Sequence, residues 1–418
     1  MSSGFLPSTS APGTVDSPEI ESQATSTPGV HPVAFIVFDP FLRALGGHQV
    51  PYIDAISREA RERGMAVSCA AGITLEDDVL AWLAANDLPL WKGSWTATTA
   101  TFPSRFVNWL VGSATLTVDL VRIARTTQST TVIFIPSGMA DTVMGAVFAA
   151  PLLPSRVQIV FQLMAWDRRE AEDRWAWGTV ALRKSAERIL RHARLHKTSI
   201  LTDQRSIAET LHRRSGILVP VVPMPITWAR YPDIRPGSRR NPVVGFLGQA
   251  RTEKGFFHLC DAISIVGPDI DFFVQATYFD NRQRLERAVA TVGQKANVTL
   301  LQDVMSNDEF PALLDRVDIL VLPYSPADYG NRSSAILIEA AGCGKPVVVP
   351  AGTTLASAVD AFAAGVVYGP WTPEALAEAI EKAVREFESL QRAALAWAPL
   401  VRQTHTVGRL LDVILDVD

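Results

Sequence analysis

Short apolar runs alternate with stretches of helical character along most of the chain. The runs lie at residues 34–39, 67–73, 131–136, 157–164, 198–202, 218–223, 243–248, 271–276, 298–303, 318–324, 346–351 and 365–370. They are nearly continuous rather than alternating with polar residues, so they predict parallel strands that are covered by helices on both faces. Helices are also predicted at residues 372–387 and 404–415. The pattern therefore predicts an α/β protein.

A turn-rich, basic stretch divides the runs into two groups, which predicts two doubly wound domains of similar size. We place an N-terminal domain at residues 32–228, a linker at 229–242 and a C-terminal domain at 243–400. Residues 1–31 contain no Lys or Arg and are rich in Ser, Thr, Pro and Gly, so we predict a disordered tail. Residues 401–418 are predicted to form a C-terminal helix, and one option is that it crosses back to the N-terminal domain.

Composition and charge narrow the class of protein. The chain has 418 residues, of which 48% are hydrophobic, and its 39 basic and 43 acidic residues leave a formal charge of −4. This balance argues against a protein that binds nucleic acid mainly through phosphates. The three cysteines show no disulfide or metal-binding spacing. We predict no secretory signal, because residues 1–31 lack a cationic start and a continuous apolar core. We also predict no membrane span, because no apolar stretch reaches the roughly 20 residues that one needs. We therefore predict a cytoplasmic protein.

The first motif with chemical content is GFLGQARTEKGF at 245–256, where a predicted strand enters a glycine-punctuated turn before a helix. Arg251 and Lys254 lie in this turn. Two cations at a helix N-terminus suit a diphosphate ligand. The alternative is a solvated turn with two ordinary surface cations, and the motif alone does not decide between them.

The second motif is VLPYSPADYGNRSSAILIEAAGCGKPVVVP at 321–350. After the strand a polar loop follows, and Ser333 or Ser334 is placed to cap a helix whose free N–H groups suit phosphates. Glu339 lies further into this apolar helix and leans toward its start, where it would reach the ribose of a nucleotide. A buried Glu needs a polar partner, which favours a ligand contact. The alternative is an exposed helix residue.

Together, these motifs resemble the nucleotide-sugar domain of the family 4 glycosyltransferases, which are enzymes of GT-B fold. The matching elements are G-x-x-R-x-x-K-G (248–255), the Pro-Tyr turn, R-S-S-x-x-x-x-E-A (332–340) and G-K-P-V-V-V (344–349). GGHQ at 46–49 resembles the N-terminal Gly-Gly loop of the family. The resemblance implies two Rossmann-like doubly wound domains that face an interdomain cleft.

The resemblance also implies a function. The chain would transfer a hexosyl or deoxyhexosyl group from a nucleotide-diphosphate sugar to a glycan or lipid-linked acceptor, with retention and without a metal or a cofactor. Arg251 and Lys254 would act as catalytic cations on the diphosphate, and Glu339 would hold the ribose. Further donor-binding positions that the resemblance implies are Gly46, Gly47, Gly248, Asp303, Tyr324, Gly330, Asn331, Arg332, Ser333 and Ser334.

The chain departs from the family pattern in three places. The family often has two Glu residues with seven residues between them, and Asn331 stands where the first would be. Gln249 follows the first glycine where many members have Arg. Residues 133–141 and 160–167 lack the His that many members carry in the N-terminal part of the cleft. The polar residues left there, which we do not rank, are Ser137, Asp141, Gln162 and Asp167.

These departures leave other functions open. One is a catalytically inactive GT-B protein that acts as a nucleotide-binding or partner-binding scaffold, and another is sugar-nucleotide epimerisation. Residues 166–197 combine Trp with many Arg and Lys, which suits either peripheral contact with the inner face of a membrane or a solvated helix with its Trp side chains in the core. His48 is either a polar group at the acceptor or a solvent-facing spacer. The sequence indicates no oligomeric state.

Overall fold

The computed structural model describes residues 34–45, 49–94, 104–138, 140–163, 184, 187, 198–234, 241–277, 282–303, 309–330 and 332–416. The chain divides into two units, Met1–His31 and Pro32–Asp418. All of the described residues belong to the second unit.

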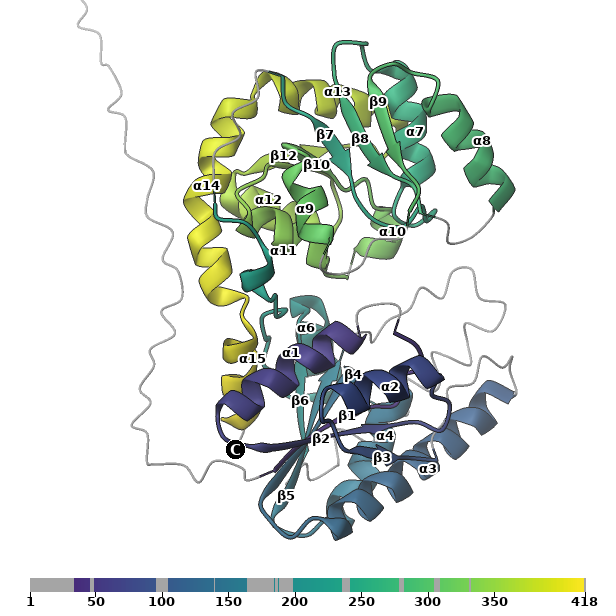
Figure 1. Ribbon diagram of the computed structural model, residues 1–418, viewed down its shortest axis with the longest axis vertical. Coiled ribbons are helices and arrows are strands. Elements are labelled where there is room, and N and C mark those ends of the chain that lie inside the picture. The colour runs from purple at the N-terminus through teal and green to yellow at the C-terminus, as the bar shows by residue number, and fades with distance from the viewer. Residues whose placement is uncertain are drawn as a thin grey trace, which may run out of the picture. The chain divides into compact units, whose positions relative to one another are not determined.

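Six parallel strands form an N-terminal sheet in the order β3-β2-β1-β4-β5-β6 (Figure 1). The strands are β1 (Ala34–Asp39), β2 (Ala66–Ala71), β3 (Leu90–Lys92), β4 (Thr131–Gly138), β5 (Val157–Leu163) and β6 (Thr198–Thr202). In the register of this sheet, Ala34 pairs with Ala66 on one side and with Thr131 on the other. The central strands are buried along nearly their whole length, as a parallel sheet with two covered faces requires.

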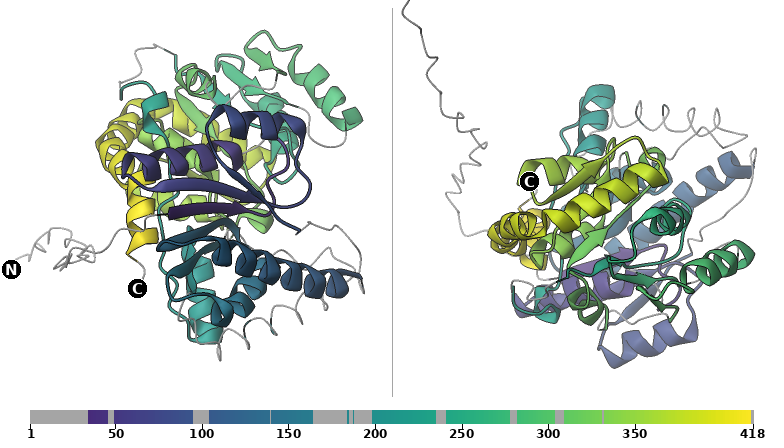
Figure 2. Two further views of the ribbon diagram at one scale, coloured as in Figure 1. Left: turned by 60° about the horizontal axis from the view of Figure 1, so that its bottom comes forward. Right: turned by 90° about the horizontal axis from the view of Figure 1, so that it is seen from above.

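Helices cover both faces of the N-terminal sheet (Figures 1 and 2). One face is covered by α3 (Ser104–Thr126), α4 (Ala140–Ala149) and α6 (Arg205–Ser215), and the other by α1 (Gln49–Glu62), α2 (Asp77–Ala85) and α15 (Val407–Leu415). Helix α15 comes from the far end of the chain. Its apolar side joins the core beside α1, and Arg63 forms an ion pair of 2.7 Å with Asp412. The last helix therefore completes the helical layer of the first sheet.

A second parallel sheet follows in the order β12-β11-β10-β7-β8-β9. Its strands are β7 (Val244–Phe246), β8 (Phe272–Gln275), β9 (Val298–Leu301), β10 (Ile319–Val321), β11 (Val347–Pro350) and β12 (Gly365–Tyr368). One face carries α7 (Phe256–Ile265), α8 (Arg282–Val292) and α13 (Pro373–Arg385), and the other carries α9 (Phe310–Asp315), α11 (Ala335–Gly342) and α12 (Thr354–Phe362). The remaining helices are α10 (Pro326–Tyr329), α14 (Phe387–Thr404) and the 3-10 turns η1 (Ala150–Leu152) and η2 (Trp228–Arg230).

Both sheets have the same topology. When the strands of each sheet are numbered from its own first strand, both read 3-2-1-4-5-6, which is the order of doubly wound nucleotide-binding sheets. The order reverses between β1 and β4 and between β7 and β10, and ligands of such folds bind at the carboxyl ends of the strands at these points. The predicted α/β class with two doubly wound sheets is confirmed.

Some predicted elements differ from the structure. The run at 218–223 is not a strand, and its only ladder contact is an isolated bridge between Val221 and Thr202. Pro220 and Pro223 lack the N–H groups that a strand would donate. The short edge strand β3 and the long helix α14 were not predicted. The helix predicted from residue 404 begins only at Val407, because Thr406 caps it through the N–H of Arg409.

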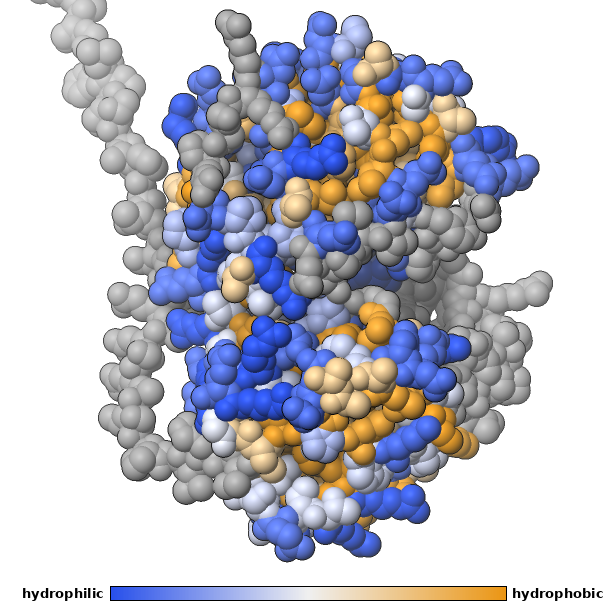
Figure 3. All heavy atoms as spheres, in the orientation of Figure 1, coloured by the Kyte–Doolittle hydropathy of each residue, from blue (hydrophilic) through white to orange (hydrophobic). Residues whose placement is uncertain are grey.

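Apolar side chains gather over each sheet region in the face shown in Figure 3, with hydrophilic side chains around them. Large apolar residues that remain exposed include Leu110, Val111 and Val118 on α3. None of the helices in the described ranges combines the length and the apolar content needed to cross a bilayer.

Candidate functional site

The turn after β7 lies at the point where the C-terminal sheet reverses its strand order. Gly248 has a φ of +129°, and its N–H donates to Oε1 of Gln275 at the end of β8, at 2.8 Å. Gly255 caps α7 with a φ of +69°, and a Cβ at this position would overlap the carbonyl oxygen of Pro323. Glycine is required there because the conformation is left-handed and because the backbone after β10 approaches so closely. The two loops at the switch point are thereby held against each other.

Lys254 is the central cation of this turn. Its ammonium lies 3.4 Å from the place that a Cβ on Gly248 would occupy and 5.9 Å from the ring centre of Tyr324. Burial lowers the pKa of Lys254 and the positive charge of Arg251 lowers it further, while the charges of Glu253 and Glu339 oppose the shift. Among the described residues, no hydrogen bond or ion pair of this ammonium is found. A largely buried cation without an acceptor is a feature that an anionic ligand would satisfy.

Arg251 lies in the same turn but is engaged by neighbouring side chains. Its Nε donates to Oε1 of Gln249 at 2.7 Å, and its Nη1 lies 3.4 Å from Oε1 of Glu253. The side chain is 30% exposed. Arg251 therefore adds positive charge near Lys254, but part of that charge is balanced by Glu253.

Glu339 lies on α11, whose first turn is capped by Ser334 through the N–H of Leu337 at 3.4 Å. The Tyr231 hydroxyl donates to Oε1 of Glu339 at 2.6 Å. Burial raises the pKa of Glu339, and the hydrogen bond from Tyr231 and the charge of Lys254 oppose that shift. The carboxylate is thus buried and oriented, with one hydrogen-bond donor already in place.

The loop before α11 supplies further polar groups. Tyr324 is almost fully buried, and its ring centre lies 4.3 Å from that of Tyr329. The guanidinium of Arg332 is exposed and lies 5.7 Å from the Tyr329 ring centre. The hydroxyl of Ser333 donates to Oδ2 of Asp203 at 2.6 Å. This last contact joins the loop to the carboxyl end of β6 in the other sheet.

At the switch point of the N-terminal sheet, the polar groups bond to one another. Ser137, near the end of β4, donates to Oδ2 of Asp39, at the end of β1, at 2.7 Å. The hydroxyl of Tyr52 donates to Oε1 of Gln162, near the end of β5, at 2.5 Å. Two of the residues left unranked by the sequence, Ser137 and Gln162, therefore belong to these pairs.

The structure brings together most of the described residues that the sequence singled out. The residues in and around the C-terminal switch point are Gly248, Arg251, Lys254, Tyr324, Gly330, Arg332, Ser333, Ser334 and Glu339. Asp303 is exposed beyond the edge strand β9, and no contact of it with this group is found among the described residues. Positions that lie outside the described residues are Gly46, Gly47, His48, Asn331, Asp167 and the predicted tail 1–31. The side chain of Asp141 and most of the Trp-rich stretch 166–197 also lie outside them.

Three residues of the site were missed in the sequence. Gln275 and Asp203 each lie at or directly after the carboxyl end of a strand, and a polar residue at that place is a signal that could have identified them. Tyr231 lies in the predicted linker, far in sequence from Glu339, and no local pattern indicates their contact. Where the structure describes the chain, no three His, Cys, Asp or Glu side chains gather as metal ligands.

Comparison with known proteins identifies the C-terminal half. Residues 233–395 match the family model of the group 1 glycosyl transferases. This part of the chain is similar to a group 1 glycosyltransferase domain. The domain contains the whole C-terminal turn and α11, and therefore Arg251, Lys254 and Glu339. The narrower assignment to family 4 stays a prediction.

Two curated relatives come from Streptomyces kanamyceticus. A 2-deoxystreptamine glucosyltransferase is 32% identical over 111 residues, which are 25% of this chain and 27% of that protein. An alpha-D-kanosaminyltransferase is 24% identical over 215 residues, which are 50% of this chain and 54% of that protein. The matches thus span about a quarter and about half of the length of these relatives.

A solved structure resembles nearly the whole fold. The crystal structure of Anabaena HepE in complex with UDP and glucose has a TM-score of 0.64 with 16% sequence identity, and the match covers 92% of this chain and 99% of that chain. At this identity the likeness concerns the fold. The GT-B fold that was predicted for the two sheets is therefore confirmed.

Proposed function

We propose that the chain is a glycosyltransferase that moves a hexosyl or deoxyhexosyl group from a nucleotide-diphosphate sugar to a glycan or lipid-linked acceptor. The observation that carries the proposal is the Lys254 ammonium, which is largely buried beside Gly248 and has no acceptor among the described residues. A diphosphate would supply a hydrogen-bond acceptor for this ammonium at the switch point where doubly wound sheets bind ligands. The UDP and glucose in the structure of HepE and the glucosyl and kanosaminyl groups in the names of the two relatives support a donor of this class.

The site acts on the leaving group. A hydroxyl oxygen of the acceptor forms a bond to the anomeric carbon while the bond between the sugar and the diphosphate breaks. The electron pair of the broken bond stays on the phosphate oxygen, where negative charge develops, and the leaving diphosphate takes up the proton of the acceptor hydroxyl. Lys254 and Arg251 stabilise this charge, and the free N–H groups at the start of α11 add to it. Because the two cations provide this stabilisation, the proposed reaction needs no metal or cofactor. Retention of the anomeric configuration is part of the proposal because the family resemblance implies it. Catalysis is then mainly electrostatic and positional.

Glu339 holds the ribose in this arrangement. One of its oxygens accepts from Tyr231, which leaves the carboxylate with further lone pairs for ribose hydroxyl groups. Its pKa is raised by burial, and both Tyr231 and Lys254 favour the charged form that accepts such bonds. The same carboxylate therefore serves ribose binding and the electrostatic balance of Lys254.

Calorimetric titration tests the proposal. Wild type and Glu339→Ala are titrated with UDP, GDP, ADP and dTDP without metal, after thermal unfolding has shown that the variant is folded. Saturable binding of one nucleotide that weakens strongly in the variant is expected. Binding without sugar transfer or donor hydrolysis would instead favour a nucleotide-binding scaffold. If none of the four nucleotides binds to wild type, the proposed function is wrong.

A further inference from the structure

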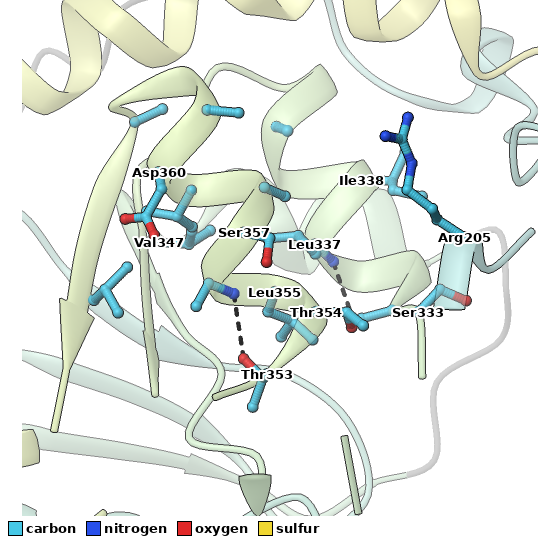
Figure 4. Close-up of a pocket in the computed structure, with 18 of the residues that line it drawn as sticks. Arg205, Ser333, Leu337, Ile338, Val347, Thr353, Thr354, Leu355, Ser357 and Asp360 are labelled. Carbon is cyan, nitrogen blue, oxygen red and sulfur yellow. Dashed lines mark hydrogen bonds between the residues drawn. The ribbon is translucent and has the colours of Figure 1, made fainter. Parts of the chain in front are cut away.

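A cavity of about 1020 Å³ opens at the start of α11 and extends between α11 and α12 (Figure 4). Its lining also includes the start of α6 and part of α14. It shares Gly330, Ser333 and Ser334 with the residues proposed to bind the donor, but Lys254 and Glu339 are not among the residues that line it. The proposed reaction, as described above, does not use this cavity.

Asp203 is the buried carboxylate of the cavity wall. It follows β6 directly, and its Oδ2 accepts the hydrogen bond of 2.6 Å from Ser333. Its Oδ1 is buried and has no hydrogen-bond partner among the described residues. Burial raises the pKa of Asp203, while hydrogen bonds from the Ser333 hydroxyl, the backbone N–H of Asp203 itself and the Gln204 side chain oppose the shift. None of these satisfies Oδ1. A buried carboxylate oxygen without a donor is destabilising unless a ligand supplies one.

The charge and the place of Asp203 limit which ligand groups fit beside its carboxylate. Like charge disfavours a phosphate beside the Asp203 carboxylate, although Arg205 and Lys345 line other parts of the cavity. Lys254 lies toward Ile336, whereas the cavity is lined by Leu337 and Ile338. The diphosphate and the cavity therefore lie on different sides of α11 and meet at its first residues. A group attached to the diphosphate there adjoins the cavity, because Ser333 lines it and donates to Asp203. The hydroxyl group of a sugar is a neutral donor that fits Oδ1.

We propose that Oδ1 of Asp203 accepts a hydrogen bond from a hydroxyl group of the transferred sugar, so that Asp203 selects the donor sugar. This inference rests on the proposed function, because it requires a nucleotide sugar at the C-terminal switch point. Ser333 is then a positioning residue that holds the carboxylate toward the cavity. The selected sugar must carry a hydroxyl group at the position that faces Asp203.

The test separates sugar binding from nucleotide binding. Calorimetry first identifies which of UDP, GDP, ADP and dTDP binds, and then measures the glucosyl, galactosyl, mannosyl and N-acetylglucosaminyl esters of that diphosphate. For each protein, the affinity for the nucleotide sugar is divided by the affinity for the nucleoside diphosphate alone. This ratio is compared between wild type and Asp203→Ala. We expect the ratio for the preferred sugar to fall about 10- to 100-fold in the variant, which is the range for a hydrogen bond to a charged group. Affinity for the nucleotide alone should fall less than affinity for the nucleotide sugar, because Asp203 contacts the nucleotide site only through Ser333.

Two controls sharpen this test. Glu209→Gln removes another carboxylate that lines the same cavity, but from an exposed position on α6, and should leave both affinities unchanged. In wild type, one deoxy analogue of the preferred sugar should lose about the same factor as the variant, and Asp203→Ala should lose nothing more with that analogue. Asp203→Asn keeps the shape of the side chain and should give an intermediate ratio.

The outcomes are distinguishable. An unchanged ratio in Asp203→Ala, a loss of nucleotide affinity equal to the loss with the sugar, or no gain from any sugar in wild type overturns the inference while nucleotide binding stands. If wild type binds none of the four nucleotides, the proposed function itself is wrong.

Discussion

The two sheets of this protein share one strand order, yet their switch points carry different chemistry. In the N-terminal sheet, Asp39 is bonded to Ser137 and Gln162 to Tyr52, so these polar groups satisfy one another. In the C-terminal sheet, Lys254 is held at the corresponding place without an acceptor among the described residues. The shared topology explains where each half can bind a ligand, but only the side chains decide which half receives the anion.

The difference teaches how a repeated fold divides two tasks. The C-terminal half is preorganised for a charged ligand, because Gly248 and Gly255 bring the turn and the strand ends close together around a cation. The polar groups at the N-terminal switch point include the Asp39 carboxylate and are already bonded to one another, so they offer no positive charge to an anion. Asp203 lies where the two halves meet through Ser333. Each of the following changes tests one side of this comparison.

The largest effect is expected for Lys254→Ala. Loss of a preorganised charge at the leaving group should lower kcat/KM for sugar transfer or donor hydrolysis about 10²- to 10³-fold. Lys92→Ala removes an exposed lysine at the edge of the N-terminal sheet and should have no measurable effect. Equal rates for Lys254→Ala and wild type would exclude the ammonium from the reaction.

The pH profile of the wild-type rate examines the same group. Burial lowers the pKa of Lys254, so the ammonium loses its proton at a lower pH than an ordinary lysine. Activity that needs this charge should fall as the pH rises through the lowered pKa. In Lys254→Arg the fall should move to higher pH, because a guanidinium keeps its charge. A profile that is the same in both proteins would assign the fall to another group.

Gly255→Ala should reduce stability more than activity in the remaining folded protein. The substitution places a Cβ against the carbonyl oxygen of Pro323 in a left-handed conformation, and we expect about 2–5 kcal/mol of destabilisation. Gly216 ends α6 with a φ of +76° but has no atom within 4 Å of its Cβ position, so Gly216→Ala should cost only about 1 kcal/mol. Urea unfolding compares the two, and equal costs would show that the contact with Pro323 yields easily.

Glu339→Gln should weaken nucleotide binding about 10- to 100-fold, because a neutral amide replaces a charged acceptor of the ribose hydroxyl groups. The measurement is calorimetric titration with the nucleoside diphosphate that binds to wild type. The matched ligand is its 2′,3′-dideoxy analogue, for which the substitution should cost little. A loss of the same size with both ligands would mean that Glu339 does not contact the ribose.

Tyr231→Phe is expected to have the smallest effect. It removes one hydrogen bond to Glu339, which should weaken nucleotide binding about 3- to 10-fold. Tyr52→Phe removes a hydroxyl from the switch point of the other sheet and should leave nucleotide affinity unchanged. If the two substitutions weaken binding equally, the assignment of the nucleotide to the C-terminal half is wrong.

Most strands could be predicted from the sequence because each is a local apolar run, and β6 was predicted with its bounds unchanged. Residues 218–223 are apolar but do not form the predicted strand, because Pro220 and Pro223 have no N–H groups to donate to a neighbouring strand. Strand β3 has only three residues, and its pairing with β2 depends on residues far away in the chain. Helix α14 contains Pro399, which weakens the local helical pattern.

The residues of the candidate site also fall into those that the local sequence predicts and those that it does not. Arg251, Lys254 and Glu339 were identified from two short motifs, because the residues of each motif are neighbours in sequence. The hydrogen bond of Tyr231 to Glu339 and that of Ser333 to Asp203 each join residues more than a hundred positions apart. No periodicity or motif records such a pair.

The sequence by itself determined the fold class, the two sheets and the cationic turn, since these follow from local hydrophobic patterns and from residues close together in the chain. Only the tertiary structure decided that α15 covers the first sheet, that Lys254 is buried without an acceptor among the described residues, and that Asp203 faces a cavity. The physical reason is that burial and hydrogen bonding depend on which distant segments pack together, and packing is settled by the whole chain.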